Sequence, residues 1–194
     1  MTSPTIDWPR RTDRLSLRPL RPDDLDQLFK ISADPEVSRW LLDVVTDPER
    51  YRVDQLNTLN DPTNFSSVIE REGAIIGEAF GHLQDAMGQS VADPDLLTHR
   101  EASIGYVLDP AHAGNGYATE VTAELLRMAF DELGVRRVTA GCFADNRASV
   151  RVLEKNGFRR EQYGVADSWH AELGWIDGCT YAILEQQWRA AAAG

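Results

Sequence analysis

Residues 104–120 of this chain read Ile104-Gly105-Tyr106-Val107-Leu108-Asp109-Pro110-Ala111-His112-Ala113-Gly114-Asn115-Gly116-Tyr117-Ala118-Thr119-Glu120. A short apolar strand is expected to end at Asp109, a turn with two glycines follows, and an amphipathic helix begins directly after it. Glycines let the backbone approach a ligand closely, and a helix N-terminus presents unpaired amides and the positive end of its dipole. The pattern predicts either a pyrophosphate-binding turn or a plain glycine turn that caps a core helix.

Two common nucleotide-binding motifs do not fit this turn. A P-loop ends in Gly-Lys-Ser/Thr, whereas Gly116 is followed by Tyr117 and Ala118. A Rossmann fingerprint needs a third glycine or alanine at a fixed spacing within a parallel βαβ unit. Thr119 stands where that residue would be, and the strands before the turn are expected to be antiparallel. Both motifs are therefore excluded.

The rest of the chain predicts one α+β domain of 194 residues around a mixed, mostly antiparallel sheet. Apolar periodicity, capping residues and Gly/Pro breaks indicate the following order: strand 15–20, helix from 22 to the break at 34–35, helix 47–59, strands 65–70 and 75–83, a long loop at 84–100, strand 103–108, helix 118–133, strand 137–143, helix 146–156, a strand from 158 and a strand at 179–184.

The charge, hydropathy and cysteine content of the chain limit the classes of partner that it is expected to bind. The chain has 20 Lys and Arg against 31 Asp and Glu, a net charge of −11, so it is expected to bind no nucleic acid and to prefer a cationic acceptor. No apolar run reaches the ~18–20 residues of a membrane span, and the N-terminus lacks the apolar stretch of a signal peptide. Cys142, Cys179 and four scattered histidines predict no metal site. A cytoplasmic protein without a membrane partner is expected.

Several segments in order carry a family resemblance. The turn Ala113-Gly114-Asn115-Gly116-Tyr117-Ala118 resembles motif A of the GNAT superfamily of acetyl-CoA-dependent N-acetyltransferases, although Ala113 departs from the Gln or Arg of that pattern. Residues 146–158 resemble the family's Asn-x-x-Ser-x-x-x-x-Glu-Lys-x-Gly-Phe signature. Together with Arg14-Leu15-x-Leu17-Arg18-Pro19 and Trp175-x-Asp177, they make the chain similar to the RimJ/RimL-like branch, named for acetylation of ribosomal-protein N-termini.

The resemblance implies a GNAT fold with a core at about 12–188, a long loop at 84–100 and a frayed tail at 189–194. It also implies acetyl-CoA as the cosubstrate and no metal. Its binding residues are expected in the central strand, the glycine turn and the helix signature: Tyr106, Val107, Leu108, Ala113, Gly114, Asn115, Gly116, Tyr117, Ala118, Thr119, Asn146 and Ser149. Arg147, Arg151 and Lys155 fall on one helical face and are interpreted as a solvated basic stripe; contact of one of them with the CoA 3′-phosphate is the alternative.

Acetyl transfer requires a base that takes a proton from the amine, and an acid can protonate the departing thiolate. Many relatives carry Glu immediately before the Ile-Gly-Tyr of the central strand, where this chain has Ser103. Glu101, two residues earlier and on the same strand face, is the first candidate base, and Glu78 is the second. Ser149 is the family-like residue near the sulfur. The Val107 amide is expected to stabilise the oxyanion.

The acceptor is expected to be a primary amine, either a protein N-terminus or a small amine such as a polyamine, amino acid or antibiotic. The first helices, the 84–100 loop and residues 167–177 are expected to form its pocket, and an aromatic and acidic set there could receive an ammonium group: Trp40, Trp169, His170, Glu172 and Trp175. Because Ser103 replaces the usual Glu, a catalytically weak CoA-binding sensor is the alternative. A homodimer is one assembly that the resemblance allows.

Overall fold

A computed structural model describes residues 6–89 and 93–192 and contains one eight-stranded sheet in the order β1-β2-β3-β4-β5-β6-β8-β7. The strands are β1 (Arg10–Arg11), β2 (Ser16–Pro19), β3 (Ser67–Arg71), β4 (Ala74–Gln84), β5 (Glu101–Leu108), β6 (Arg137–Phe143), β7 (Arg159–His170) and β8 (Gly174–Leu184). Every neighbouring pair is antiparallel except β5 and β6. The predicted α+β architecture with a mixed, mostly antiparallel sheet is confirmed.

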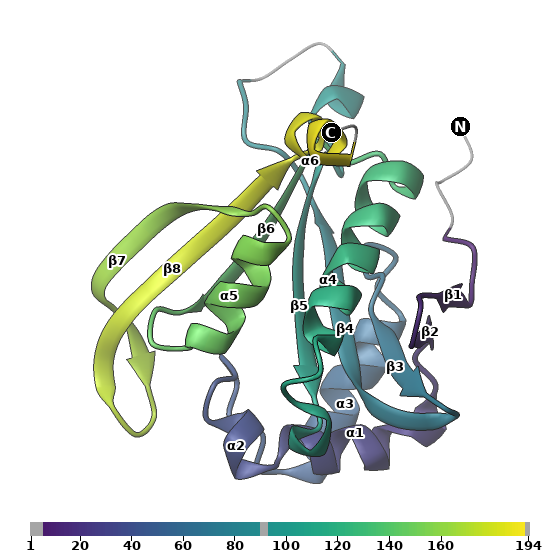
Figure 1. Ribbon diagram of the computed structural model, residues 1–194, viewed down its shortest axis with the longest axis vertical. Helices are drawn as coiled ribbons and strands as arrows, with labels where there is room; N and C mark the ends of the chain where they lie inside the picture. Colours follow the sequence, from purple (N-terminus) through teal and green to yellow (C-terminus); the bar gives the residue numbers. More distant parts are fainter. Residues whose placement is uncertain (1–5, 90–92, 193–194) are drawn as a thin grey trace.

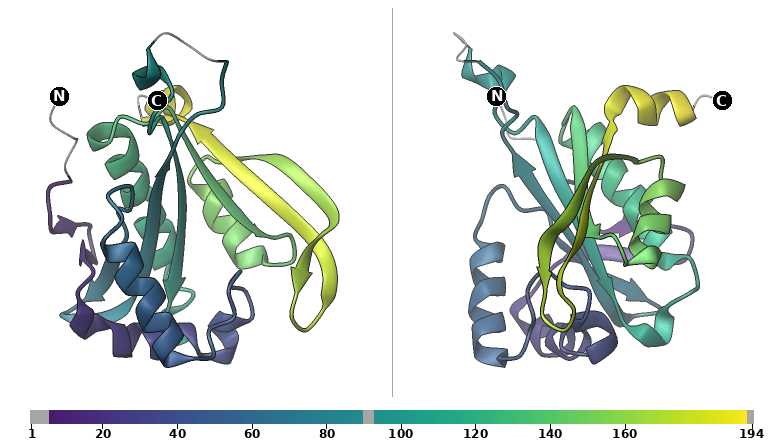
Figure 2. Two further views of the ribbon diagram at one scale, coloured as in Figure 1. Left: turned by 180° about the vertical axis from the view of Figure 1, so that it is seen from behind. Right: turned by 90° about the vertical axis from the view of Figure 1, so that its left-hand side faces the viewer.

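Helices cover both faces of this sheet, as Figures 1 and 2 show. One face carries α4 (Tyr117–Arg127), which continues into the π-helical turn η4 (Met128–Glu132), and α5 (Arg147–Lys155). The other face carries α1 (Leu25–Ser32) and α3 (Pro48–Leu59), with the short α2 (Pro35–Ser38) beside them. The chain ends in α6 (Glu185–Ala192), and short 3-10 turns lie at η1 (Pro22–Asp24), η2 (Pro94–Leu96) and η3 (Pro110–His112).

Two buried clusters hold the layers together. The larger one packs α4 and η4 against the central strands through side chains such as Val121, Leu125 and Val138, each 0% exposed. The smaller one packs α1 and α3 on the opposite face through Leu25, Leu28 and Tyr51. Burying a side chain of this kind stabilises the fold by about 1.5–3 kcal/mol relative to leaving it in water.

Capping residues explain where several helices begin. The Asp47 side chain accepts from the Glu49 amide at 2.9 Å, directly before α3. Asn146 accepts from the Ser149 amide at 3.1 Å, at the start of α5. The sequence predicted both starts, since Asp and Asn are favoured N-cap residues.

Three of the differences from the sequence expectations concern the bounds of helices and of the long loop. Asp34-Pro35 was expected only to end a helix, but Asp34 caps α2 and Pro35 occupies its first position, where its missing amide costs nothing. The tail expected to fray at 189–194 is helical through Ala192, and residues 193–194 lie outside the described part of the chain. The 84–100 loop contains η2, and its residues 90–92 also lie outside the described part.

In the described ranges, no helix has both the length and the apolar character that crossing a membrane requires.

Candidate active site: a gap between two parallel strands

The central feature of the sheet is a gap between β5 and β6. The two strands pair only at Glu101–Arg137, Ala102–Val138 and Ser103–Thr139, after which β5 continues to Leu108 paired with β4 but unpaired on its β6 side. Figure 1 shows the two strands diverging from this closed end. Half of β5 therefore presents one edge to the gap.

The register with β4 shows which backbone groups of β5 face the gap. The Asp109 amide donates to the Ile76 carbonyl at 2.9 Å on β4. Because partners alternate along an antiparallel pair, the Val107 amide also faces β4, and the amides of Tyr106 and Leu108 face the gap. Thr139 Oγ1 donates to the Ala102 carbonyl across the closed end at 3.2 Å, which agrees with this alternation. The Val107 amide therefore does not face the gap, contrary to the sequence expectation.

The glycine turn lies at the end of the unpaired half of β5. Gly114 and Gly116 adopt φ of +76° and +81°, in the left-handed region that favours glycine, and residues 113–116 are exposed. A Cβ atom added to Gly114 would meet no protein atom within 4 Å, so the space above it is open to a ligand. The first amides of α4, which begins at Tyr117, have no intrahelical partner. The turn thus fits an anionic group.

Arg14 braces this turn, a role that sequence analysis did not assign. Its Nη1 donates to the Asn115 carbonyl at 2.8 Å, and its Nη2 lies 2.6 Å from a Glu120 oxygen. Its guanidinium also lies over the Tyr117 ring, 4.7 Å from the centroid. The only sequence signal was the family-like motif near the N-terminus, because no local pattern connects residues about 100 positions apart.

Ser149 lies across the gap from β5. Its hydroxyl oxygen is 3.4 Å from the phenol oxygen of Tyr106, and Asn146 binds its amide. The structure therefore brings Tyr106, Asn146 and Ser149 together at the first turn of α5.

Glu101, the first candidate base, lies at the wrong end of β5. Its carboxylate forms ion pairs with Arg136 at 2.6 Å and Arg137 at 2.9 Å, where β5 and β6 remain paired. Each carboxylate oxygen of Glu101 therefore accepts a hydrogen bond from one of the two guanidinium groups. Six residues of strand, about 20 Å, separate it from Val107 beside the gap. Glu101 therefore lies away from the part of β5 that borders the gap.

Glu78 has the environment of a base. It is 1% exposed on β4, directly opposite Val107, so it lies beside the unpaired half of β5. Its Oε2 is 3.5 Å from both the Tyr51 hydroxyl and Gln55 Nε2, whereas its buried Oε1 has no hydrogen-bond partner within the described chain. Burial raises the pKa of Glu78 to about 8, and the Tyr51 hydrogen bond only partly opposes this shift.

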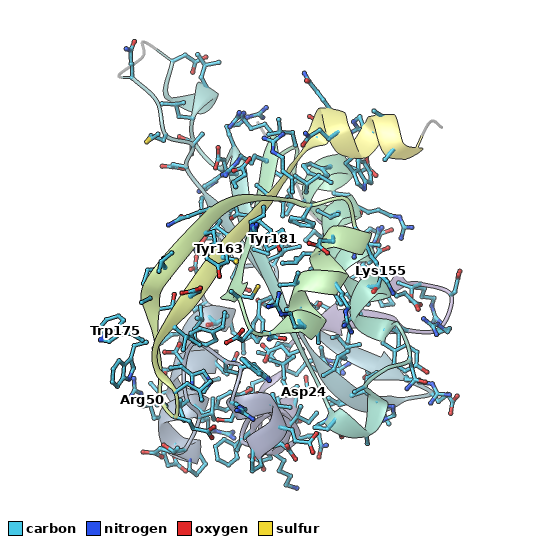
Figure 3. The ribbon with its side chains drawn as sticks, turned by 60° about the vertical axis from the view of Figure 1, so that its left-hand side comes forward. Asp24, Arg50, Lys155, Tyr163, Trp175 and Tyr181 are labelled. Atoms are coloured by element: carbon cyan, nitrogen blue, oxygen red, sulfur yellow. The ribbon has the colours of Figure 1, made fainter. Side chains whose placement is uncertain are left out.

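The expected acceptor residues separate into two groups. Trp40 packs against His170 with ring centroids 5.7 Å apart, and Arg39 pairs with Glu172 at 3.5 Å, so these residues meet where α2 approaches the β7–β8 hairpin. Trp169 and Trp175 instead pack on each other, 61% and 64% exposed. Figure 3 shows Trp175 projecting away from the body of the protein.

Asp177, from the same motif as Trp175, has a structural role in that hairpin. Its carboxylate accepts from the Ala166 amide at 2.8 Å and from the Tyr163 hydroxyl. These two bonds fix the irregular pairing of β7 and β8 between Gly164 and Ser168.

The 84–100 loop lies at the end of the sheet away from the glycine turn. It leaves β4 at Gln84 and enters β5 at Glu101, the closed end of the β5–β6 pair (Figure 1). The Ala86 amide donates to the Leu97 carbonyl at 2.8 Å, which joins the two sides of the loop. In its described residues, this segment does not border the gap, so the expected contribution to the acceptor pocket is not supported.

The basic stripe on α5 is exposed as expected. Arg147, Arg151 and Lys155 lie on the surface, and none forms an ion pair with another described residue. Figure 3 shows Lys155 on the outer side of α5. These cations are a local exception to the acidic net charge.

In the described residues, no cluster of three or more His, Cys, Asp or Glu side chains is arranged to hold a metal ion. The site instead combines an unpaired strand edge with a glycine turn at a helix N-terminus. That combination suits a ligand with amides along its length and a diphosphate at one end. Coenzyme A has both features, an amide-rich pantetheine arm and a pyrophosphate.

Comparison with known proteins gives the family. A profile described as an acetyltransferase (GNAT) domain matches residues 14–159. The uncharacterized N-acetyltransferase YoaA of Bacillus subtilis is 29% identical over 155 residues, covering 77% of this chain and 82% of that protein. The chain belongs to the GNAT family and is an acetyl-CoA-dependent N-acetyltransferase.

Solved structures share the fold at lower identity. Spermidine N-acetyltransferase from Vibrio cholerae, in complex with CoA and spermine, aligns with a TM-score of 0.78 at 18% identity over 92% of this chain and 99% of that one. RimJ from Mycobacterium smegmatis, in complex with CoA-disulfide, aligns with a TM-score of 0.70 at 21% identity over 92% and 89% of the two chains.

Proposed function

We propose that the protein transfers the acetyl group of acetyl-CoA to a primary amine by direct attack in a ternary complex. The observation that carries this proposal is the unpaired edge of β5, which leads from the Tyr106 and Leu108 amides to the glycine turn. The amide-rich pantetheine arm would pair with this edge like an added strand. The pyrophosphate would lie at Gly114–Thr119, where the turn and the first amides of α4 favour negative charge.

Glu78 is the proposed base. Its free Oε1 accepts a proton from the amine through water, while Tyr51 and Gln55 hold the other oxygen. The side chain lies with Tyr51 on the α1/α3 face of the sheet, so the acceptor is expected to arrive from that side. Burial raises the pKa of Cys142 to about 11, and this neutral thiol supports direct transfer over a covalent acyl-enzyme.

The acceptor is proposed to be a protein N-terminus, as in the RimJ/RimL-like branch, or a small amine such as a polyamine or an antibiotic. A polyamine is the substrate named for the spermidine N-acetyltransferase that shares the fold. The acidic net charge of −11 favours a cationic acceptor in either case.

The test is mass spectrometry of products after incubation with acetyl-CoA and a panel of N-terminal peptides, polyamines and amino acids. An acetylated amine formed together with free CoA thiol is the expected result. Tight CoA binding without any acetylated product would instead favour the sensor alternative, which Ser103 in place of the family Glu supports. Failure to bind CoA at all would overturn both.

A further inference from the structure

The gap between β5 and β6 is crossed by the side chain of Tyr106. Tyr106 belongs to β5, and its phenol reaches Ser149 on α5, the helix that follows β6 in the chain. Tyr106 packs with the α4 and α5 side of the core, together with Cys142 and Val150. The Tyr106–Ser149 contact therefore spans the gap on that face.

At 3.4 Å, either the Tyr106 phenol or the Ser149 hydroxyl can donate this hydrogen bond. A hydroxyl has one proton and two acceptor positions, so Ser149 can donate in only one direction. In the first turn of a helix, a serine hydroxyl readily bonds to nearby backbone groups. If the Tyr106 phenol donates to Ser149 Oγ, the Ser149 proton stays available to a ligand in the gap.

We propose that Tyr106 is a positioning residue that orients the Ser149 hydroxyl as a hydrogen-bond donor to the CoA sulfur. This inference rests on the proposed function, because it requires CoA in the gap. No proton need leave either residue: the Tyr106 O–H bonds to Ser149, and the Ser149 O–H bonds to the sulfur. The pair stabilises the negative charge on the thiolate after the acetyl group has left.

The surroundings of Tyr106 favour this role. Burial raises the pKa of Tyr106, while the bond to Ser149 partly opposes the shift, so the phenol keeps its proton over the working pH range. Within the described residues, Ser149 is the hydrogen-bond partner found for this phenol. Charge-assisted bonds to a thiolate are roughly twice as strong as neutral ones, so the bond to the ionised sulfur gains more than the bond to the thiol.

The test measures the ionisation of bound CoA rather than catalysis. Wild-type protein, Tyr106→Phe, Ser149→Ala and the double variant are saturated with CoA, and thiolate ultraviolet absorbance is followed against pH. We expect Tyr106→Phe to lower the thiolate-to-thiol ratio about tenfold, a shift of about one pKa unit. Ser149→Ala should lower the ratio at least as far, and the double variant should match Ser149→Ala. Tyr163→Phe, which removes a phenol bonded to Asp177 in the β7–β8 hairpin rather than to Ser149, is the matched control and should leave the ratio unchanged.

Each other outcome overturns a defined part of the account. If the pKa of the bound CoA thiol does not change in Tyr106→Phe, Tyr106 has no positioning role. Additive losses in the double variant mean that Tyr106 acts on the sulfur directly. CoA affinity is measured at a pH where the thiol is protonated, and intact affinity there shows that each variant is folded. Normal CoA binding together with an unchanged pKa of the bound thiol overturns only this inference. Absence of CoA binding to the wild type defeats the proposed function.

Discussion

Replacing Glu78 with Gln keeps the size of the side chain and removes the proposed base. We expect a loss of roughly 100-fold or more in kcat, the usual contribution of general-base catalysis, with little change in CoA affinity. Because the pKa of Glu78 is raised to about 8, the wild-type rate should rise as the pH approaches that value and then level off. A pH–rate profile of both proteins checks this. An identical profile in Glu78→Gln would exclude Glu78 as the base.

Glu101→Gln is the comparison for Glu78→Gln, because both carboxylates lie on the same face of the sheet. Its partners are Arg136 and Arg137 at the closed end of the β5–β6 pair, so we expect unchanged kcat and a stability loss of about 1 kcal/mol or less. Steady-state kinetics and urea unfolding measure the two effects. A fall in kcat comparable to that of Glu78→Gln would restore Glu101 to the chemistry.

Single residues also show the limit of the sequence. Strand alternation placed Glu101 on the same face of its strand as Ser103, but it carries no information on how far β6 follows β5. That distance depends on packing around the gap and separates the Glu101 and Glu78 carboxylates. Likewise, the contact between Arg14 and the Asn115 carbonyl joins distant parts of the chain that no local periodicity connects.

The glycine turn is tested with a matched pair of glycines. Gly114 and Gly134 both have positive φ, +76° and +66°, and an added Cβ meets no atom within 4 Å at either position. Alanine should therefore cost each about 1–2 kcal/mol of stability through the backbone alone. Only Gly114→Ala places a methyl group where the pyrophosphate is proposed to lie. Calorimetric titration should show weaker CoA binding for Gly114→Ala, and equal affinities would remove the turn from the site.

The junction of β2 and η1 explains the family-like Arg18 in structural terms. Arg18 binds Asp24 through two nitrogens at 2.7 and 2.8 Å and Glu70 at 2.7 Å. We expect Arg18→Ala to lower the free energy of unfolding by roughly 3 kcal/mol, because it leaves the buried Asp24 without its partner. Denaturant melts measure the loss. The exposed Arg50, paired with Asp54 at 3.7 Å, is the control and should lose under about 0.5 kcal/mol on substitution with alanine.

Elements were predictable where the signal is local. Capping by Asp47 and Asn146 and the breaks at Gly134 and Gly157 placed the helices well, because each signal acts within one turn. The position of the 84–100 loop relative to the gap was not predictable from the sequence. Its length suggested a place at the acceptor pocket, but its position depends on which end of β5 pairs with β6. The sequence also grouped Trp169 and Trp175 with Trp40, because it does not show that the first two side chains pack on each other.

For the whole molecule, Glu78 links stability to pH. Its pKa rises from 4.5 to about 8 on folding, so the folded protein keeps a proton that the unfolded chain releases in this interval. This contribution is fully present below about pH 4.5 and is lost as the pH rises through about 8. Each pKa unit corresponds to about 1.4 kcal/mol. Wild-type stability should therefore fall more steeply than that of Glu78→Gln over this range in urea unfolding, and parallel curves would contradict the buried carboxyl.

Residue-resolved amide hydrogen exchange, measured with and without CoA, tests whether acetyl-CoA occupies the gap between β5 and β6. We expect new protection at the Tyr106 and Leu108 amides and in the first turn of α4, with no change at the Val107 amide, which already faces β4. Protection confined to other surfaces, with the Tyr106 and Leu108 amides unaffected, would mean that CoA does not bind in this gap.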